Sequence, residues 1–211
     1  MSNAAEQSLL SRLLAVRGTV KFAYMTMLIS AVLSLIASFV LSVQAFELAQ
    51  DPDAVLSCDV NAVLSCGAVA RSWQAQVLGF PNAYLGLIAE PVIITLAAGA
   101  LAGARYSRWF LLGAQAVYTI GLGFAYWLFY QSMFHIGSLC PWCLLITVST
   151  TVVFANITRI NVLEGNLPVP AGLRQRVEGF YKAQYDLLVL LTVLTVLAIG
   201  LILKYGPGLF A

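Results

Sequence analysis

Charged residues are scarce in this chain. Asp, Glu, Lys and Arg make up 9% of its 211 residues and hydrophobic residues make up 61%, whereas a typical soluble domain carries about 25% charged residues. The mean hydropathy is +0.89. This composition excludes an ordinary soluble domain and indicates an integral membrane protein whose surroundings include membrane lipid. The net charge of +2, without a basic or acidic tail, gives no reason to expect nucleic acid as a partner.

Other absences exclude several kinds of binding site. The single histidine, His135, excludes a metal or haem site with several histidine ligands, and no glycine-rich phosphate-binding loop is present. Four cysteines can in principle bind zinc, but an apolar run long enough to span a membrane separates the two cysteine pairs, so we expect no metal site. The first apolar run is too long for a cleaved signal peptide.

Five apolar runs are long enough to cross the hydrocarbon core of a membrane, which takes about 20 helical residues. They cover Ala23–Phe46, Ala83–Leu101, Trp109–Tyr130, Leu139–Ile157 and Leu187–Lys204. The sequence therefore predicts an all-α integral membrane protein with five transmembrane helices. Its expected parts are an N-terminal segment (1–22), a region with four spans (23–158) and a loop at 47–82, a connector (159–186), and a fifth helix with a tail (187–211).

Basic residues predict the orientation of these helices. Nine of the eleven fall on one side of an alternating five-span topology, namely Arg12, Arg17, Lys21, Arg105, Arg108, Arg159, Arg174, Arg176 and Lys182. Only Arg71 and Lys204 fall on the other side. Because cytoplasmic loops carry the excess of Lys and Arg, we expect a protein of the cytoplasmic (inner) membrane with a cytoplasmic N-terminus.

The four cysteines form two unlike pairs. Cys140 and Cys143 form C-P-W-C, and a CxxC pair is suited to exchange between dithiol and disulfide. Cys58 and Cys66 lie in the polar loop 47–82. The predicted topology puts both pairs at the outer, oxidising face of the membrane. Two pairs on one face indicate a redox relay. The alternative is a static disulfide at Cys58–Cys66 with incidental cysteines in the fourth run.

The position of C-P-W-C at a predicted helix N-terminus ranks its two thiols. Unpaired backbone N–H groups and the helix dipole stabilise a thiolate there, so Cys140 is the expected exchanging thiol. Cys143 lies one turn deeper and is the expected donor to a membrane-soluble quinone. Electrons would enter at Cys58 and Cys66. We expect Cys66 to meet Cys140, because Cys58 is then free to face an incoming partner.

Three motifs in order carry a family resemblance. The chain contains CDVNAVLSC at Cys58–Cys66, then PNAYLG at Pro81–Gly86, then CPWC before LLIT. In these motifs and their spacing, residues Tyr24–Ile157 resemble the vitamin K epoxide reductase (VKOR) family. The disulfide-generating DsbB family has its CxxC in the first outer loop and its second pair in the next, and this chain has the reverse order.

This resemblance implies a four-helix bundle around a quinone, with an outer-loop helix as a lid and a peripheral fifth helix. It implies that Cys58 and Cys66 are the shuttle pair, that Cys140 and Cys143 are the active-site pair, and that Asn82 hydrogen-bonds a quinone carbonyl. Asn82 is also a candidate cap of the second helix. Asp59 and Ser65 match the family as supporting loop residues. These two, together with Asn82 and the cysteines, complete the candidate site.

The implied activity is that of a bacterial homologue acting in disulfide bond formation. It would oxidise a separate thioredoxin-fold, DsbA-like thiol protein and reduce a quinone of the menaquinone, ubiquinone or vitamin K type. Two alternatives stay open, namely epoxide reduction proper and a membrane transporter with a structural loop disulfide. Thr147 stands where vertebrate-type members carry a tyrosine, so the resemblance does not extend to coumarin sensitivity. Glu90, inside the second run, is either packed in the bundle or functional.

Overall fold

The computed structural model describes residues 19–209, and five long helices dominate them. These are α2 (Val20–Gln50), α4 (Ala83–Leu101), α5 (Arg108–Gln131), α6 (Pro141–Leu163) and α8 (Tyr185–Leu209). Each of the five is long and apolar enough to cross a membrane. The predicted fold class, an all-α membrane protein with five spanning helices, is confirmed. Most of the predicted N-terminal segment 1–22, with Arg12 and Arg17, lies outside the described residues.

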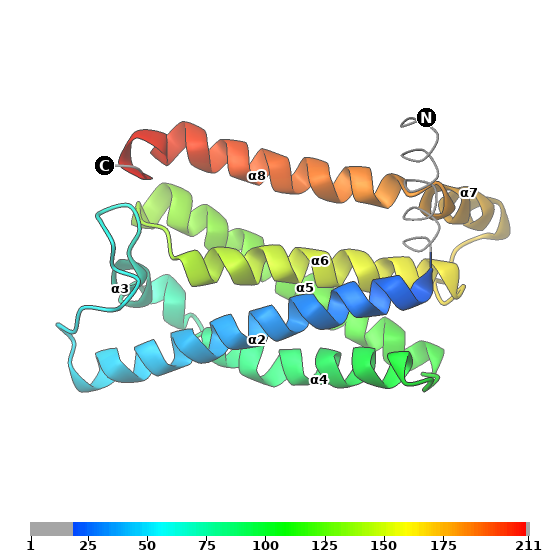
Figure 1. The fold of residues 1–211 in the computed structure, drawn as a ribbon, viewed down its shortest axis with the longest axis horizontal. Coiled ribbons are helices and arrows are strands. Elements are labelled where there is room, and N and C mark those ends of the chain that lie inside the picture. The colour runs from blue at the N-terminus through cyan, green and yellow to red at the C-terminus, as the bar shows by residue number, and fades with distance from the viewer. Residues whose placement is uncertain (1–18, 210–211) are drawn as a thin grey trace, which may run out of the picture.

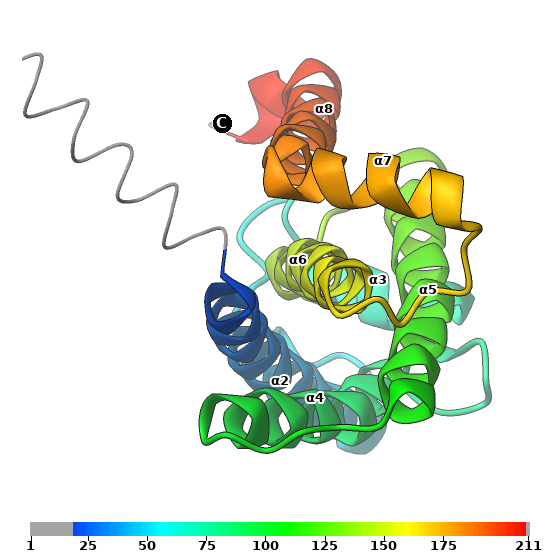
Figure 2. The ribbon, with the colours of Figure 1, turned by 90° about the vertical axis from the view of Figure 1, so that its right-hand side faces the viewer.

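Four of these helices form a bundle and the fifth lies beside it. Viewed end-on, α6 has α2 and α5 on two sides and α8 beyond it, while α4 closes the bundle against α2 (Figure 2). The bundle core is made of fully buried apolar side chains from all four helices, including Met27, Ile93, Leu96, Leu111, Val153 and Ile157. In contrast, α8 contacts only α6 and α7 (Ala171–Lys182) extensively and leaves its apolar surface uncovered (Figure 1).

One helix has the bounds predicted from the sequence, and the others differ from the predicted bounds at their ends. The helix predicted over Ala83–Leu101 has those bounds, and it continues through Pro91. The first helix is longer than predicted at both ends. At its N-terminus, the Thr19 side chain caps the helix by accepting a hydrogen bond from the Phe22 N–H at 3.2 Å. The third continues beyond α5 into one π-helical turn, η2 (Ser132–Ile136).

The fourth predicted helix, Leu139–Ile157, was placed too early. The structure begins α6 at Pro141 and ends it at Leu163. Leu139 is instead in an isolated β-bridge, and Cys140 has extended backbone angles (φ −103°, ψ 118°). Pro141 then occupies the first helical position, where its missing N–H costs no hydrogen bond.

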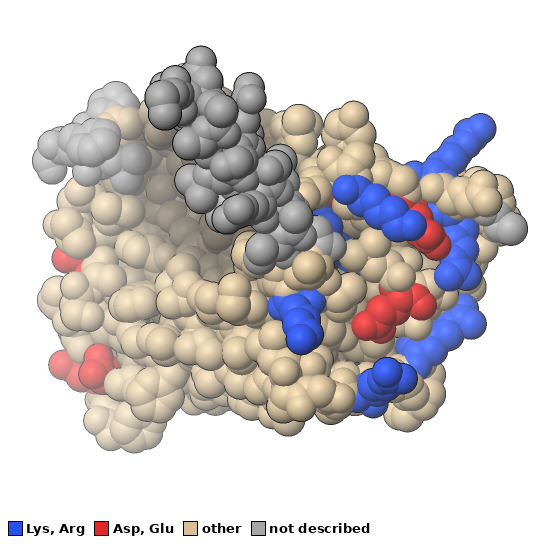
Figure 3. Space-filling view, turned by 45° about the vertical axis from the view of Figure 1, so that its right-hand side comes forward, with Lys and Arg blue, Asp and Glu red and all other residues tan. Residues whose placement is uncertain are grey.

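The predicted connector 159–186 is largely helical. Its beginning belongs to α6, and its middle forms α7, which crosses the end of the bundle (Figure 2). Figure 3 shows Lys and Arg gathered at this same end of the molecule. We call it the basic end, and the opposite end, where residues 58, 66, 140 and 143 lie, the cysteine end.

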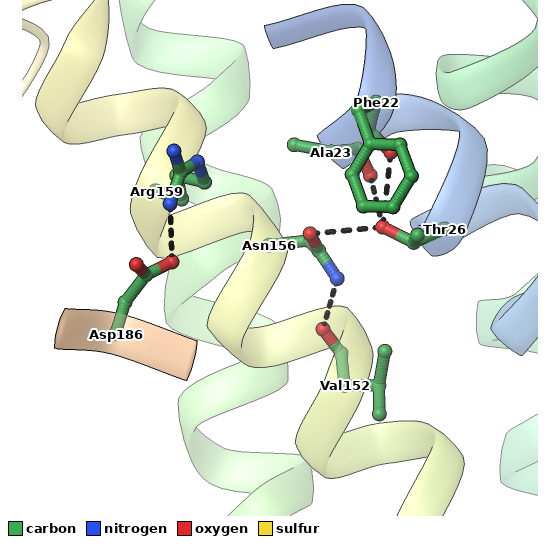
Figure 4. Close-up of polar contacts among 7 residues, drawn as sticks. All are labelled: Phe22, Ala23, Thr26, Val152, Asn156, Arg159 and Asp186. Carbon is green, nitrogen blue, oxygen red and sulfur yellow. Dashed lines mark hydrogen bonds and ion pairs between the residues drawn. The ribbon is translucent and has the colours of Figure 1, made fainter. Parts of the chain in front are cut away.

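Polar contacts join the helices near the basic end (Figure 4). Thr26 on α2 donates to Oδ1 of Asn156 on α6 at 3.0 Å, and Asn156 Nδ2 donates to the Val152 carbonyl at 2.8 Å. One turn further along α6, Arg159 forms an ion pair with Asp186 on α8 at 2.5 Å. These contacts attach both α2 and α8 to the central helix.

Candidate redox site

The long loop at the cysteine end carries the first cysteine pair. Cys58 and Cys66 form a disulfide with a Cα–Cα distance of 5.6 Å. Cys66 begins a short helix, α3 (Cys66–Ala70), and a 3-10 turn, η1 (Trp73–Gln76), follows it. The loop therefore contains helical structure, in line with the outer-loop helix that the family resemblance implies. Cys58 is 8% exposed and Cys66 is 1% exposed, so both cysteines are buried.

Asp59 organises the turn between these two cysteines. Its Oδ1 accepts hydrogen bonds from the Ser65 hydroxyl and the Gly67 N–H, both at 2.8 Å, and its Oδ2 accepts from the Leu56 N–H at 2.9 Å. Burial raises the pKa of Asp59, but these hydrogen bonds and the nearby Arg71 guanidinium outweigh it and lower the pKa below its usual value. The ionised Asp59 carboxylate thus stabilises the conformation of the loop between Cys58 and Cys66, which we call the cysteine loop.

A β-bridge connects this loop to the second cysteine pair. The Leu139 N–H donates to the Val63 carbonyl at 2.7 Å, and the Ser65 N–H donates to the Leu139 carbonyl at 3.0 Å. Each of the two bridged segments is followed closely by a cysteine, the loop segment by Cys66 and the other by Cys140. Cys58, Cys66 and Cys140 belong to one buried cluster, together with Leu56.

Cys140 occupies the N-cap of α6, as the sequence predicts for C-P-W-C. Its Sγ accepts a hydrogen bond from the Cys143 N–H at 3.3 Å. Both of these cysteines are free thiols. The hydrogen bond from the Cys143 thiol is the largest influence on the pKa of Cys140 and lowers it. Burial and the Asp59 carboxylate oppose this effect, backbone N–H groups of the helix start reinforce it, and the net shift is downward.

A cavity of about 430 Å³ opens beside three of the four cysteines. Cys66, Cys140 and Cys143 line it, whereas Cys58 does not. Most of the remaining wall is apolar and comes from α2, α4, α5 and α6, with Leu41, Leu48, Phe124, Leu128, Phe129 and Leu144 among its side chains. The volume falls in the range of about 300–1,000 Å³ that is usual for small-molecule sites.

Asn82 lies in the wall of this cavity. Its Nδ2 donates to the Gln74 carbonyl at 2.7 Å, and its own N–H donates to the Ala75 carbonyl at 2.9 Å. Among the described residues, its Oδ1 is buried and accepts no hydrogen bond. Asn82 occupies the N-cap position of α4, but it has helical backbone angles and its side chain makes no capping bond to that helix. Its side chain instead connects the η1 turn to the start of α4.

Two buried polar residues also belong to the site. The sequence does not indicate a role for Gln44, and for Glu90 it leaves two roles open. The Gln44 side chain on α2 donates to Cys58 Sγ at 3.3 Å. Glu90 lines the cavity and accepts hydrogen bonds from the Ser34 hydroxyl at 2.7 Å and the Tyr118 hydroxyl at 2.8 Å. The only available signal for Gln44 was a lone amide in an apolar run, which carries no motif.

Three further residues, Thr147, Trp142 and His135, lie at the edge of the site. Thr147 lines the cavity, but its hydroxyl donates to the Cys143 carbonyl at 2.9 Å. Trp142 packs against the cysteine cluster. His135 is exposed on η2, where its ring contacts Tyr130 edge-on at 5.7 Å.

Five membrane-spanning helices, with two cysteine pairs beside an apolar cavity, define a membrane-embedded thiol oxidoreductase. A family model described as the vitamin K epoxide reductase family matches residues 25–158. The match covers well over half of the chain, which therefore belongs to this family, as its motifs indicated. It is a multi-pass membrane protein and a quinone-linked disulfide oxidoreductase, and this assignment replaces the transporter alternative. A comparison with curated proteins finds no match.

Proposed function

We propose that the protein generates disulfides by passing electrons from a thioredoxin-fold, DsbA-like thiol protein to a quinone. The observation that carries the proposal is the single cavity lined by Cys66, Cys140 and Cys143. One member of the loop pair and both members of the C-P-W-C pair therefore meet at one small-molecule site. Cys58, which lies outside the cavity wall and is the more exposed loop cysteine, is the one that faces the partner.

The cavity fits a quinone in size and in chemistry. Its apolar wall suits a lipid-soluble ring. Asn82 Nδ2 donates one of its two hydrogens to the Gln74 carbonyl, and the other is the donor that we assign to a ring oxygen near the cysteines. A bound quinone supplies a sink for the two electrons that a dithiol releases when it becomes a disulfide. Cys143, the third residue of a spanning helix and part of the cavity wall, is the thiol placed beside that sink.

The relay consists of successive disulfide exchanges. A partner thiolate attacks Cys58, the Cys58–Cys66 bond breaks, and Cys66 leaves as a thiolate. The partner's second thiolate then displaces Cys58, so the partner leaves as a disulfide and the loop pair is a dithiol. When the other pair is oxidised, the Cys66 thiolate attacks Cys140, the Cys140–Cys143 bond breaks, and Cys143 leaves as a thiolate facing the cavity. Cys58 then attacks Cys66, the loop disulfide re-forms, and Cys140 leaves, so that Cys140 and Cys143 hold the two electrons that a quinone would accept. The β-bridge beside Cys66 and Cys140 supports the transfer between these two cysteines by holding the two segments together.

Purified protein tests the proposal when it is mixed with a reduced thioredoxin-fold protein and a short-chain ubiquinone, and quinone absorbance is followed. Wild-type protein should consume quinone and oxidise the partner in equal amounts. Cys143→Ala should abolish turnover. Cys58→Ala should block the protein donor while dithiothreitol still supports quinone reduction through Cys140 and Cys143. Normal partner oxidation by Cys58→Ala would overturn the shuttle assignment.

We also propose that the cysteine end faces the outer side of the cytoplasmic membrane, with the N-terminus in the cytoplasm. The gathering of Lys and Arg at the opposite end of the molecule supports this orientation (Figure 3). An outward-facing cysteine end gives the protein access to exported proteins, in a compartment where disulfides persist.

A further inference from the structure

A buried glutamine lies against the sulfur that we assign to the partner. Gln44, near the cysteine end of α2, is 4% exposed. Its Nε2 lies 3.3 Å from Cys58 Sγ and 3.4 Å from the Ser57 hydroxyl, and its Oε1 lies 3.5 Å from the same sulfur. Both polar atoms of the amide therefore face Cys58.

The strength of this contact depends on the state of the sulfur. A disulfide or thioether sulfur is a weak acceptor, whereas a hydrogen bond to an ionised group is roughly twice as strong as one between neutral groups. A neutral thiol can donate its proton to an amide oxygen. An amide fixed in place before the charge develops favours the charged state most, because no reorganisation is needed.

We propose that Gln44 is part of the exchange site, where its amide N–H stabilises the Cys58 sulfur as that sulfur becomes negatively charged. This inference rests on the proposed relay. After the partner has bonded to Cys58, its second thiolate attacks its own bonded sulfur, and a disulfide forms within the partner. The partner–Cys58 bond breaks, and Cys58 leaves with the electron pair beside Gln44 Nε2. The partner loses two electrons, and the loop pair gains them.

The ionisable groups near Cys58 include two cysteines, Asp59 and Arg71. Cys66 and Cys140 share the buried cluster of Cys58. Asp59 is next in the chain, and its carboxylate is already occupied by three hydrogen-bond donors. Arg71 directs its side-chain N–H groups to the Pro52 and Ala54 carbonyls, at 2.9 and 2.8 Å. Gln44 is thus a neutral donor whose effect on Cys58 can be separated from that of the charged groups by substitution.

The test uses the full-length protein with Cys58 as its one cysteine, obtained with Cys66→Ser, Cys140→Ser and Cys143→Ser. The rate of alkylation by iodoacetamide is measured against pH, and its midpoint reports the ionisation of Cys58. Gln44→Leu should raise the midpoint by about one pH unit, which is about tenfold less thiolate at neutral pH. Ser57→Ala removes the second acceptor of the same amide, and it should leave the midpoint unchanged.

A second set of proteins separates this effect from a general loosening of the loop. In protein whose one cysteine is Cys66, Gln44→Leu should not shift the midpoint. Gln44→Glu keeps the side-chain shape, and it should raise the Cys58 midpoint at least as far as Gln44→Leu does. No shift at Cys58, or equal shifts at both cysteines, would overturn the inference. Alkylation needs no quinone, so failure of the proposed function is seen separately, as absent quinone reduction by the wild-type protein.

Discussion

At the scale of single residues, the two thiols of C-P-W-C have different surroundings although they are only three positions apart. Cys140 precedes the spanning helix and receives hydrogen bonds from the first turn, whereas Cys143 lies in the helix and lines the cavity. The same four-residue motif therefore provides one thiol for exchange and another for contact with the cavity.

The Cys143 thiol should control the reactivity of Cys140. Its hydrogen bond is the largest cause of the lowered pKa of Cys140, so Cys143→Ala should raise that pKa and slow alkylation of Cys140 at pH 7 by up to about tenfold. Cys143→Ser retains a hydroxyl donor and should preserve most of the rate. The pH profile of alkylation, followed by mass spectrometry, measures both variants. Equal rates in the two variants would contradict this explanation.

Asp59 should make the cysteine loop sensitive to acid. Because the pKa of Asp59 is lowered in the folded protein, its contribution to stability is present above the unfolded value of about 3.9. That contribution is lost as the pH falls through the folded value. Reduction of the Cys58–Cys66 disulfide by a phosphine, which remains active in acid, should therefore accelerate below about pH 4.

Asp59→Asn is the matched control for this acid effect. The amide cannot accept all three hydrogen bonds as strongly as a carboxylate does, so this variant should be reduced faster than wild type at pH 7. It should also lack the additional acceleration in acid. A wild-type rate that stays flat down to pH 3 would show that the loop does not depend on the charge of Asp59.

Some residues of the site could be predicted from the sequence and others could not. All four cysteines, Asp59 and Asn82 belong to motifs, and the structure brings them to one end of the bundle. Gln44 belongs to no motif and reaches Cys58 only because the loop folds back onto α2. The hydrogen-bond partner of Asn82 could not be predicted either, because the Gln74 carbonyl is brought to Asn82 only by the fold of the η1 turn.

At the scale of helices, the ion pair between Arg159 and Asp186 attaches α8 to the bundle (Figure 4). The two side chains are 4% and 13% exposed. Removing one partner leaves a buried charge without its counterpart, so Asp186→Ala should cost about 3–5 kcal/mol. Unfolding by sodium dodecyl sulfate in mixed micelles measures this free energy.

The double variant Arg159→Met/Asp186→Leu tests the reason for that cost. Among the described residues, Arg159 Nε and Nη2 and Asp186 Oδ1 make no hydrogen bonds, so the pair is only partly satisfied. Apolar replacement of both partners should therefore cost less than the loss of either one alone. If the double variant is as unstable as the sum of the single variants, the two side chains are not coupled, and the unpaired buried charge is not the reason for the cost of the single variants.

Helix positions were predictable because apolar length determines where a chain can cross a membrane. Helix ends were less so, because they depend on local contacts. Cys140 and the bridged Leu139 are apolar by composition yet precede α6, and polar Thr19 lengthens α2 through its cap. The helix α7 was not predicted because its residues are mixed in polarity and because Pro168 and Pro170 directly precede it.

At the scale of the whole molecule, the separation of basic residues from cysteines leads to a prediction about topology. Alkaline phosphatase folds only after export, since it needs disulfides. Fused after Ala211, it should be active, and fused before Met1 it should be inactive. A cytoplasmic reporter, β-galactosidase, should give the opposite pattern at the same two ends. Phosphatase activity at the N-terminus would reverse the proposed orientation.

The cavity is a property of the whole bundle and could not be read from any one segment. Its wall takes side chains from four helices and the long loop, and no run of the sequence records which faces meet. Sequence reasoning could rank Cys143 as the deeper thiol from helix geometry alone. It could not place Glu90 and Tyr118 in contact, because they come from different helices.

The bridge between Leu64 and Leu139 has a consequence for how the loop opens. Cys66 lies two residues after the bridged Leu64, whereas Cys58 lies six residues before it. We therefore expect a loop movement that admits a partner to Cys58 to pivot at the bridge and to leave Cys66 near Cys140. Amide exchange at Ser65 and Leu139 should accordingly remain slow after the loop disulfide is reduced. Cys58 can thus become accessible to a partner while Cys66 and Cys140 remain in position for the exchange between them.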